Sequence, residues 1–213
     1  MPTIQTLRPN VTREEAVQQF SRGLSGWVRR AAVGPLRLLA DVYIPFHLFQ
    51  VDITNHGRTE TRLLGIDAIT GSLDPYDFER APDSAKLVLI DTNNSLPPKL
   101  DERRAAQLAI EKTRRILFSR GFFRMRDLKI STSYTSETWY VPYWVGFQGA
   151  NSKASLSVID AIRRRFEGAK VRRLLQEWLH EECTVLAKAH SPAGSTSTKL
   201  SSGANPRRIN FHN

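Results

Sequence analysis

An aromatic pattern around a proline occurs twice in the chain, and this repetition constrains the fold more than any other feature. The stretch from Tyr43 to Gln50 (YIPFHLFQ) is matched by the stretch from Tyr140 to Gln148 (YVPYWVGFQ). The four residues Ile-Asp-Ala-Ile follow each copy, at 66–69 and at 159–162. Because two landmarks recur in the same order, the sequence indicates an internal duplication.

The residues around the first copy predict a helix followed by strands. Residues 12–15 (TREE) have the spacing of a capping box, so a helix should begin there. The apolar stretch 36–53 is too long for one ordinary strand, and we divide it near Ala40-Asp41 into two. Residues 55–58 (NHGR) predict a turn, and 61–68 the returning strand of a hairpin.

The second copy has the same predicted surroundings. Asn, Ser and Pro at 93–98 indicate a linker between two halves. Asp101 is placed to cap a helix that runs to about Arg120. Strands are then predicted at residues 128–133, 137–148 and 154–162.

We therefore predict an α+β fold made of two pseudo-repeated α-β-β-β halves, residues 1–98 and 99–190, with an antiparallel sheet that the halves can share. A C-terminal amphipathic helix is predicted from about Ala169 to Ala189. Its apolar stripe consists of Val171, Leu174, Leu175, Trp178, Leu179, Cys183 and Leu186. Residues 191–213 are rich in Ser, Thr, Gly and Asn, and we predict a disordered tail.

The two prolines predict where their strands lie. Since proline lacks the N–H that a central strand donates, Pro45 and Pro142 imply an edge strand, a bulge or a strand entry. Alternation along each strand then gathers Tyr43, Pro45 and His47 on one face, as it does Tyr140, Pro142 and Trp144. These side chains either fill the core between helix and sheet or form an open face for a peptide or a stacked base. In the second case the binding residues are Tyr43, His47, Tyr140 and Trp144.

A net charge of +10, from 31 Lys and Arg against 21 Asp and Glu, favours polyanionic partners. The densest basic cluster lies after the second Asp-Ala-Ile, and Phe166 lies within it. It consists of Arg163, Arg164, Arg165, Lys170, Arg172 and Arg173. Such a cluster is either a solvated face or a set of phosphate contacts, and the second interpretation makes nucleic acid an alternative partner.

Asp67 and Asp160 recur in the same frame, where a carboxylate either caps a turn or takes part in acid–base or metal chemistry. His180 and Cys183 lie one helical turn apart, but two ligands do not make a metal site, and Cys183 fits the apolar stripe as a buried thiol. Nucleotide-binding, zinc-helix and nucleophile-elbow motifs are missing from the sequence. We predict neither a metal nor a cofactor.

The sequence also bears on location and assembly. A single cysteine rules out an intramolecular disulfide and fits a reducing compartment. The first ten residues lack the apolar core of a secretory signal, and no apolar run has the length of a membrane span. We predict a cytoplasmic protein without a transmembrane segment, in which the C-terminal helix can serve homo-oligomerisation.

The first hairpin resembles a known family. Its last strand and turn, residues 66–71 (IDAITG), follow the aromatic strand 49–53 and are similar to the Val-Asp-Ala-x-Thr-Gly turn of PepSY-type domains. The second copy keeps Asp160 and Ala161 but lacks the Thr-Gly pair. The resemblance implies a regulatory or inhibitory binding module, with no catalytic residues to carry over.

These observations lead to one functional prediction and two alternatives. We predict a non-enzymatic interaction or regulatory module whose partner is another protein or a peptide. The first alternative is a nucleic-acid-binding protein that uses the cluster from Arg163 to Arg173. The second is an enzyme with its site between the two halves, which would require Asp67, Asp160 and a histidine to converge.

Overall fold

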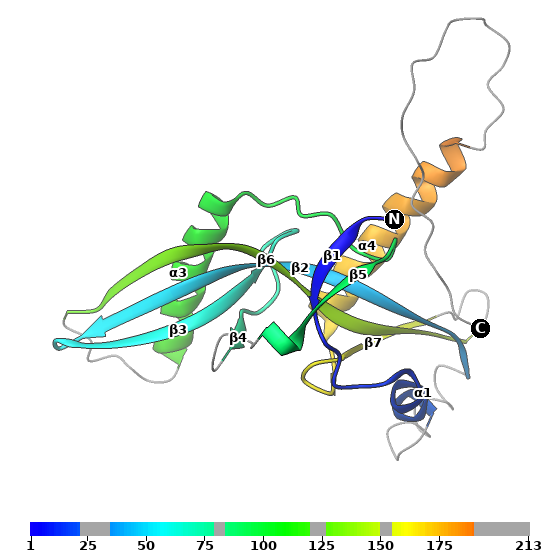
Figure 1. Cartoon of the computed structure of the whole chain (residues 1–213), viewed down its shortest axis with the longest axis horizontal. Helices are drawn as coiled ribbons and strands as arrows, with labels where there is room; N and C mark the ends of the chain where they lie inside the picture. Colours follow the sequence, from blue (N-terminus) through cyan, green and yellow to red (C-terminus); the bar gives the residue numbers. More distant parts are fainter. Residues whose placement is uncertain (22–34, 79–83, 120–126, 150–154, 190–213) are drawn as a thin grey trace, which may run out of the picture.

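The computed structural model describes residues 1–21, 35–78, 84–119, 127–149 and 155–189, and all statements about the fold refer to these residues. They form an α+β fold built on a large, mostly antiparallel sheet (Figure 1). Its strands are β1 (Thr3–Leu7), β2 (Leu36–Asn55), β3 (Arg58–Asp67), β4 (Tyr76–Phe78), β5 (Leu87–Asp91), β6 (Lys129–Gln148), β7 (Ser155–Asp160) and β8 (Arg165–Phe166). The helices are α1 (Arg13–Ser21), α3 (Glu102–Ser119) and α4 (Ala169–Ala189), with a short 3-10 turn, η1 (Ser84–Lys86).

The two long strands β2 and β6 form the centre of the sheet. The strand order is β4-β3-β2-β6-β1-β5, and β7 and β8 extend the sheet from β6. The division near Ala40-Asp41 that the sequence predicted is wrong, because β2 runs through it without a break. The predicted gap between 133 and 137 is likewise bridged by β6. Strand pairing along nearly the whole length of both segments explains this, since each strand supplies the other's hydrogen-bond partners.

The prolines lie in these central strands at positions of unbroken register, so the prediction of an edge strand, a bulge or a strand entry is wrong. Pro45 pairs with Tyr140, and Pro142 pairs with Tyr43. The carbonyl of Pro45 accepts the N–H of Ala68 at 2.8 Å, and that of Pro142 accepts the N–H of Ala161 at 3.1 Å. In an antiparallel strand, the N–H and C=O of one residue point to the same side. The side of Pro45 that lacks an N–H therefore faces the residue just after β3, and that of Pro142 faces the residue just after β7. At both places the regular strand pairing has ended, so no ladder hydrogen bond is lost.

Turns and caps agree with the local sequence. His56 and Gly57 connect β2 to β3 with positive φ angles of 49° and 74°. At α1, the N–H of Glu15 donates to the Thr12 hydroxyl at 3.2 Å, and the N–H of Thr12 donates to Glu15 Oε2 at 3.0 Å. At α3, Asp101 Oδ1 accepts the N–H of Arg104 at 2.9 Å. The capping residues predicted for these two helices are therefore confirmed.

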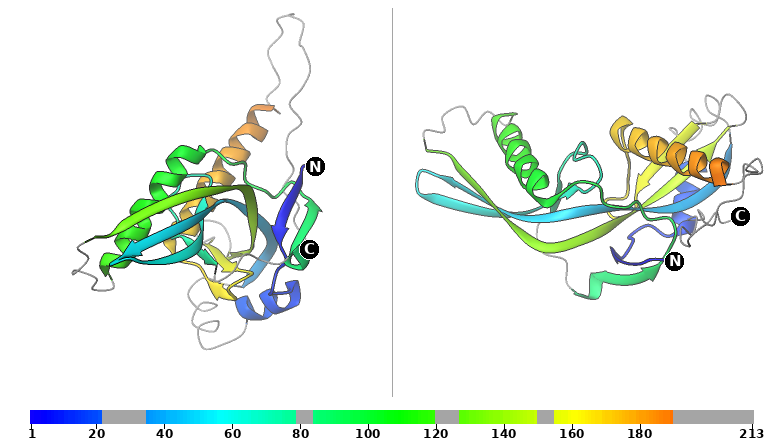
Figure 2. Two further views of the ribbon diagram at one scale, coloured as in Figure 1. Left: turned by 60° about the vertical axis from the view of Figure 1, so that its left-hand side comes forward. Right: turned by 90° about the horizontal axis from the view of Figure 1, so that it is seen from above.

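Alternation along β2 divides the core between the two faces of the sheet. Val42, Ile44, Phe46 and Leu48 join the apolar residues of α4 on one face. On the other face, Phe49, Val51 and Ile53 pack with Ala105 and Ala109 of α3, and Leu39 packs with Ala16 and Phe20 of α1. Figures 1 and 2 place α3 over one end of the long β2–β6 pair and α4 over the other end.

Three strands were not predicted from the sequence. β1 pairs with β5 in antiparallel fashion and meets β6 at Thr6 and Tyr140. β4 and β8 are short edge segments that pair with β3 and β7. Segments of this length carry too little pattern to be separated from loops, and their pairing depends on neighbours that are distant in the sequence. The predicted tail at 191–213 lies outside the described residues.

Candidate functional site

Tyr43 and His47, two of the predicted binding residues, are buried in the scaffold. Tyr43 is 9% exposed, its hydroxyl donates to Asp41 Oδ2 at 2.9 Å, and burial raises the pKa of its phenol. His47 is 7% exposed, and its Nε2 lies 2.8 Å from the carbonyl oxygen of Leu100. Because a carbonyl only accepts, Nε2 carries the proton, and Nδ1 accepts from the Thr138 hydroxyl at 3.1 Å. Both side chains connect elements of the fold.

Tyr140 and Trp144 are half-buried and also contact neighbouring segments. The carbonyl of Tyr140 accepts the Thr6 hydroxyl at 2.9 Å. Trp144 Nε1 donates to the carbonyl of Val11, just before α1, at 2.9 Å. These contacts support the interpretation in which the aromatic strands build the core and seat the helices.

The two aspartates cap turns. Asp67 accepts the N–H groups of Ile69, Thr70, Gly71 and Leu73. Asp160 Oδ1 accepts the N–H groups of Ile162 and Arg163, each at 2.8 Å, while its buried Oδ2 has no partner. Burial raises the pKa of Asp160 against the effect of these hydrogen bonds.

The basic cluster is divided among different surroundings. Arg164 extends to Glu15 in the first turn of α1, with Nη2 and Oε1 3.0 Å apart. Arg172 and Arg173 are exposed on α4. Arg163, Arg165 and Lys170, in contrast, line one pocket.

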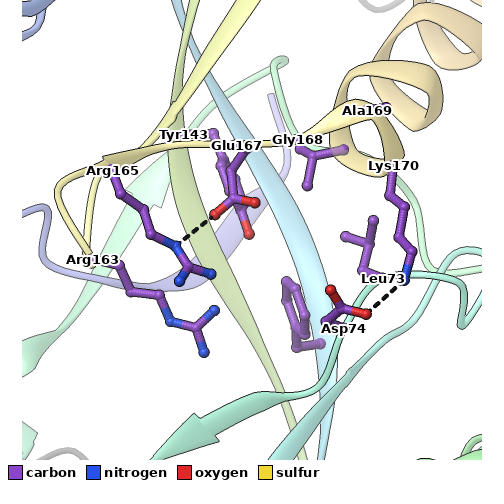
Figure 3. A pocket seen from close by; sticks show the side chains of 11 residues that line it. Leu73, Asp74, Tyr143, Arg163, Arg165, Glu167, Gly168, Ala169 and Lys170 are labelled. Carbon is purple, nitrogen blue, oxygen red and sulfur yellow. Dashed lines mark hydrogen bonds and ion pairs between the residues drawn. The ribbon is translucent and has the colours of Figure 1, made fainter.

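This pocket, called the α4 pocket below, has a volume of about 270 Å³. It lies between the first turn of α4, the β8 segment and the turn that holds Leu73 and Asp74 (Figure 3). Arg163 and Arg165 lie on one side, Lys170 and Asp74 lie on the other, and Tyr143 and Glu167 lie between them. Residues from four separate parts of the chain thus meet around one opening.

Two ion pairs form part of the pocket wall. Lys170 Nζ donates to Asp74 Oδ1 at 2.6 Å, and Arg165 Nε donates to Glu167 Oε1 at 3.3 Å. The hydrogen bond from Lys170 lowers the pKa of Asp74. Burial raises the pKa of Glu167, opposed by the Arg165 charge and increased by Asp160. With three cations and two carboxylates, the lining carries one formal positive charge in excess.

Several donors in the α4 pocket lack an acceptor among the described residues. The Arg163 guanidinium stacks on the Tyr76 ring at 3.5 Å from the centroid. Its charge acts on Asp160 and Glu167 and opposes the rise of their pKa values, but no described carboxylate lies within ion-pair distance of it. Tyr143 is 3% exposed and lines the pocket, and no hydrogen bond joins its hydroxyl to another of the described residues. The hydrogen bonds of α4 begin with Arg172 N–H to Gly168 O, so the N–H groups of residues 169–171 have no acceptor in the helix. Each of these three groups can donate a hydrogen bond to a bound anion.

Sequence reasoning identified three pocket cations but missed Asp74, Tyr143, Glu167 and the role of Gly168. Gly168 carried a usable signal, because glycine directly before an amphipathic run is an acceptable N-cap. Asp74 and Tyr143 reach the pocket from strands and turns that only the tertiary fold brings to α4.

Metal and membrane features were also tested in the described residues. No group of three or more His, Cys, Asp and Glu side chains there is arranged to hold a metal ion. Cys183 is exposed, so its predicted burial is wrong, because the buried stripe of α4 stops near Trp178. Over the same residues, no helix has the length and apolar character of a membrane span.

Comparisons with known proteins give no relative. No family model, no curated protein and no solved structure matches the chain. The functional argument therefore depends on the geometry of the site.

Proposed function

We propose that this chain is a non-enzymatic binding module whose ligand places an anionic group in the α4 pocket. The observation that carries the proposal is the convergence of unpaired donors, which are the Arg163 guanidinium, the Tyr143 hydroxyl and the first N–H groups of α4. Helix N-termini and arginine side chains are the groups that proteins use for carboxylate and phosphate. The single excess positive charge of the lining matches one anionic group.

The surroundings of the acidic and histidine side chains favour binding over catalysis. The Asp67 carboxylate is occupied by the N–H groups of its own turn. His47 projects from the face of the sheet opposite to that of Asp67, and it donates to the Leu100 carbonyl. The convergence that the enzyme alternative requires is therefore not found among the described residues.

An NMR titration tests the anion site. Sodium acetate and inorganic phosphate are added separately to ¹⁵N-labelled protein at constant ionic strength. We expect saturable shifts of the amide signals of Gly168, Ala169, Lys170 and Val171. Arg163→Gln should weaken binding about tenfold, because a charge-assisted hydrogen bond is lost. Arg172→Gln, which removes the same charge from α4 outside this lining, should leave the affinity unchanged. Equal losses in both variants, or no saturable shift, would refute the proposal.

We also propose that the two halves are copies of one helix–strand–strand unit. Several contacts recur at matching places and support this. His47 and Trp144 each donate to the carbonyl that precedes a helix N-cap, at Leu100 and Val11. Ala68 and Ala161 each accept an N–H from the segment just before that cap, from Lys99 and Asn10. Ala105 and Ala16 lie at the same position after their caps, and both are fully buried.

The PepSY-type resemblance of residues 66–71 agrees with a binding module, and a cytoplasmic location and helix-mediated self-association are further proposals. Nucleic acid stays the alternative ligand. It would have to be held through Arg163, Arg165, Lys170 and Arg173, beside the carboxylates of Asp74 and Glu167. Binding to mixed-sequence oligonucleotides at low salt would support it.

A further inference from the structure

The α4 pocket is the first of three adjoining pockets along one side of α4. The second, of about 300 Å³, shares Ala169 and Lys170 with the α4 pocket and reaches Glu177. The third, of about 70 Å³, shares Leu174 and Glu177 with the second and extends to Trp178 and Glu181. Because neighbouring pockets share residues, the three lie in a row between α4 and the segments that contain Thr70 and Pro97, and this row is called the groove below.

The chemistry of the groove changes from one end to the other. The unpaired donors described above lie at the start of α4. Farther along, Glu177 borders both the second and the third pocket. The third pocket is lined by apolar side chains such as Ile69, Leu96 and Leu174. Lys170 and Arg173 line the second pocket together with Glu177, and Lys99 pairs with Glu181 at 2.7 Å beside the third. The order along the groove is therefore anion-binding, mixed in charge and largely apolar.

A buried donor without an acceptor among the described residues lies at the far end. Trp178 is 6% exposed and lines the third pocket, and its indole Nε1 has no acceptor. Buried donors without a partner are rare in native proteins, and a ligand carbonyl is one way to satisfy them. The Tyr143 side chain lines the first pocket and the Trp178 side chain lines the third, so a side chain with a donor that has no acceptor among the described residues lies at each end of the groove.

From this arrangement we infer that the groove binds an extended peptide whose free C-terminal carboxylate occupies the α4 pocket. The inference rests on the proposed function and names its ligand. A carboxylate supplies one negative charge, as the lining requires. A basic side chain of the peptide faces Glu177, and an apolar side chain enters the third pocket. A polyanion fits less well, because the three linings together hold five cations and four carboxylates, which leaves one positive charge in excess for the whole groove.

The length of the groove sets the length of the peptide. From Ala169 to Glu181 the helix rises about 18 Å, at about 1.5 Å per residue. An extended chain covers about 3.3 Å per residue, so about five residues of ligand fill the groove.

The experiment uses two pools of N-acetylated, randomised pentapeptides, one with a free C-terminal carboxylate and one with a C-terminal amide. The full-length chain captures peptides, which are identified by mass spectrometry, and the best peptide is resynthesised in both forms. We expect the acid to bind at least about tenfold more tightly than the amide. In NMR spectra the indole N–H signal of Trp178 should move with the peptide and not with acetate.

A groove-blocking variant separates this inference from the proposed function. Ser72 is exposed and lines the second pocket, so Ser72→Trp should abolish peptide binding while acetate still shifts the Gly168–Val171 signals. Ser131→Trp places the same side chain on an exposed site of β6 and should change neither. A peptide amide that binds as tightly as the acid would overturn the inference. So would capture of neither pool by protein that still binds acetate, or tighter, Ser72-dependent binding of a dT oligonucleotide. Loss of acetate and phosphate binding as well would refute the proposed function itself.

Discussion

The turn after β3 and the turn after β7 begin with the same residue, yet their carboxylates are in different states. Asp67 accepts several N–H groups of its own turn, and both of its oxygens have partners. Asp160 uses only Oδ1, and its Oδ2 is buried without a partner. Four residues after each aspartate the backbone has a positive φ, which is 68° at Gly71 and 58° at Arg164. The first turn uses the residue that favours this conformation, and the second does not.

The difference shows that backbone strain is found in the turn after β7 and not in the turn after β3. The first turn is closed against α3, because a Cβ at Gly71 would collide with Leu108. The second turn leads into the α4 pocket, and its Thr-Gly pair is replaced by Arg163 and Arg164. Strained and unsatisfied groups tend to gather at binding sites. We interpret the first turn as scaffold and the second as part of the site.

The helix packed on each hairpin extends the comparison. Phe49 of β2 and Ala109 of α3 lie in one core cluster, so the bulky side chain comes from the strand. At the other hairpin the bulky side chain comes from the helix, because Phe20 of α1 packs on Gly146 of β6. A Cβ added to Gly146 would lie 3.0 Å from the Phe20 ring.

Moving the bulky side chain from helix α1 to strand β6 should have the largest effect on the free energy of unfolding. Phe20→Ala should lower the free energy of unfolding by about 4 kcal/mol, because it leaves a cavity. Adding Gly146→Phe to that variant copies the arrangement at Phe49 and Ala109 and should recover at least about 1 kcal/mol. Gly146→Phe alone should destabilise through overpacking. Urea unfolding of the full cycle measures the coupling. A double variant as unstable as the sum of the singles would contradict the shared architecture.

Gly71→Ala should cost about 3 kcal/mol, from the left-handed backbone conformation together with the collision with Leu108. Gly57→Ala is the matched control. That glycine also has a positive φ, 74°, but nothing lies within 4 Å of the added Cβ, so about 1 kcal/mol should be lost. Chemical denaturation compares the two. If both variants lose the same stability, packing against α3 does not distinguish the first turn.

The aspartates should respond unequally to amide substitution at neutral pH. Asp67→Asn should cost about 2 kcal/mol, because its new NH₂ group faces N–H donors of the turn. Asp160→Asn should change stability by less than about 1 kcal/mol, because Oδ2 has no partner to lose. Chemical denaturation of both variants measures the two losses of stability. Equal losses would show that the two turns do not differ in this respect.

The pH dependence of stability is a further test of the difference between Asp67 and Asp160. Burial raises the pKa of Asp160 in the folded state above its ordinary value of 3.8, so folding favours the protonated form. This contribution to stability is fully present below the ordinary pKa and is lost as the pH rises through the raised value. Asp160→Asn should therefore flatten the decline of stability above pH 3.8. A pH series of unfolding curves with unchanged slope would show that Asp160 is not the group responsible.

The smallest effect is expected at Arg164. Arg164→Gly should stabilise the protein by about 1 kcal/mol, because glycine adopts the positive φ without steric cost. The exposed ion pair with Glu15 that is lost contributes little. Thermal unfolding measures the gain, and Glu15→Gln serves as the control for the ion pair alone. A loss of stability in Arg164→Gly would show that the second turn is not strained.

Local chemistry in the sequence determined the caps of α1 and α3, the tight turn at His56-Gly57 and the alternation of faces around Pro45 and Pro142. These features depend on residues a few positions apart, where backbone geometry leaves few alternatives. The repeated aromatic pattern correctly indicated strands that form the core of an α+β fold. The same reasoning divided β2 and β6, because the length of a strand depends on the partner that pairs with it.

Only the tertiary structure decided what the basic residues do. From the sequence, the residues from Arg163 to Arg173 formed one cluster, but the fold directs Arg164 to Glu15 and turns Arg163, Arg165 and Lys170 into the α4 pocket. Asp74 and Tyr143 enter that pocket from segments far away in the chain. Charge density is a property of sequence, whereas the pairing and burial that give each charge its role are set by long-range packing.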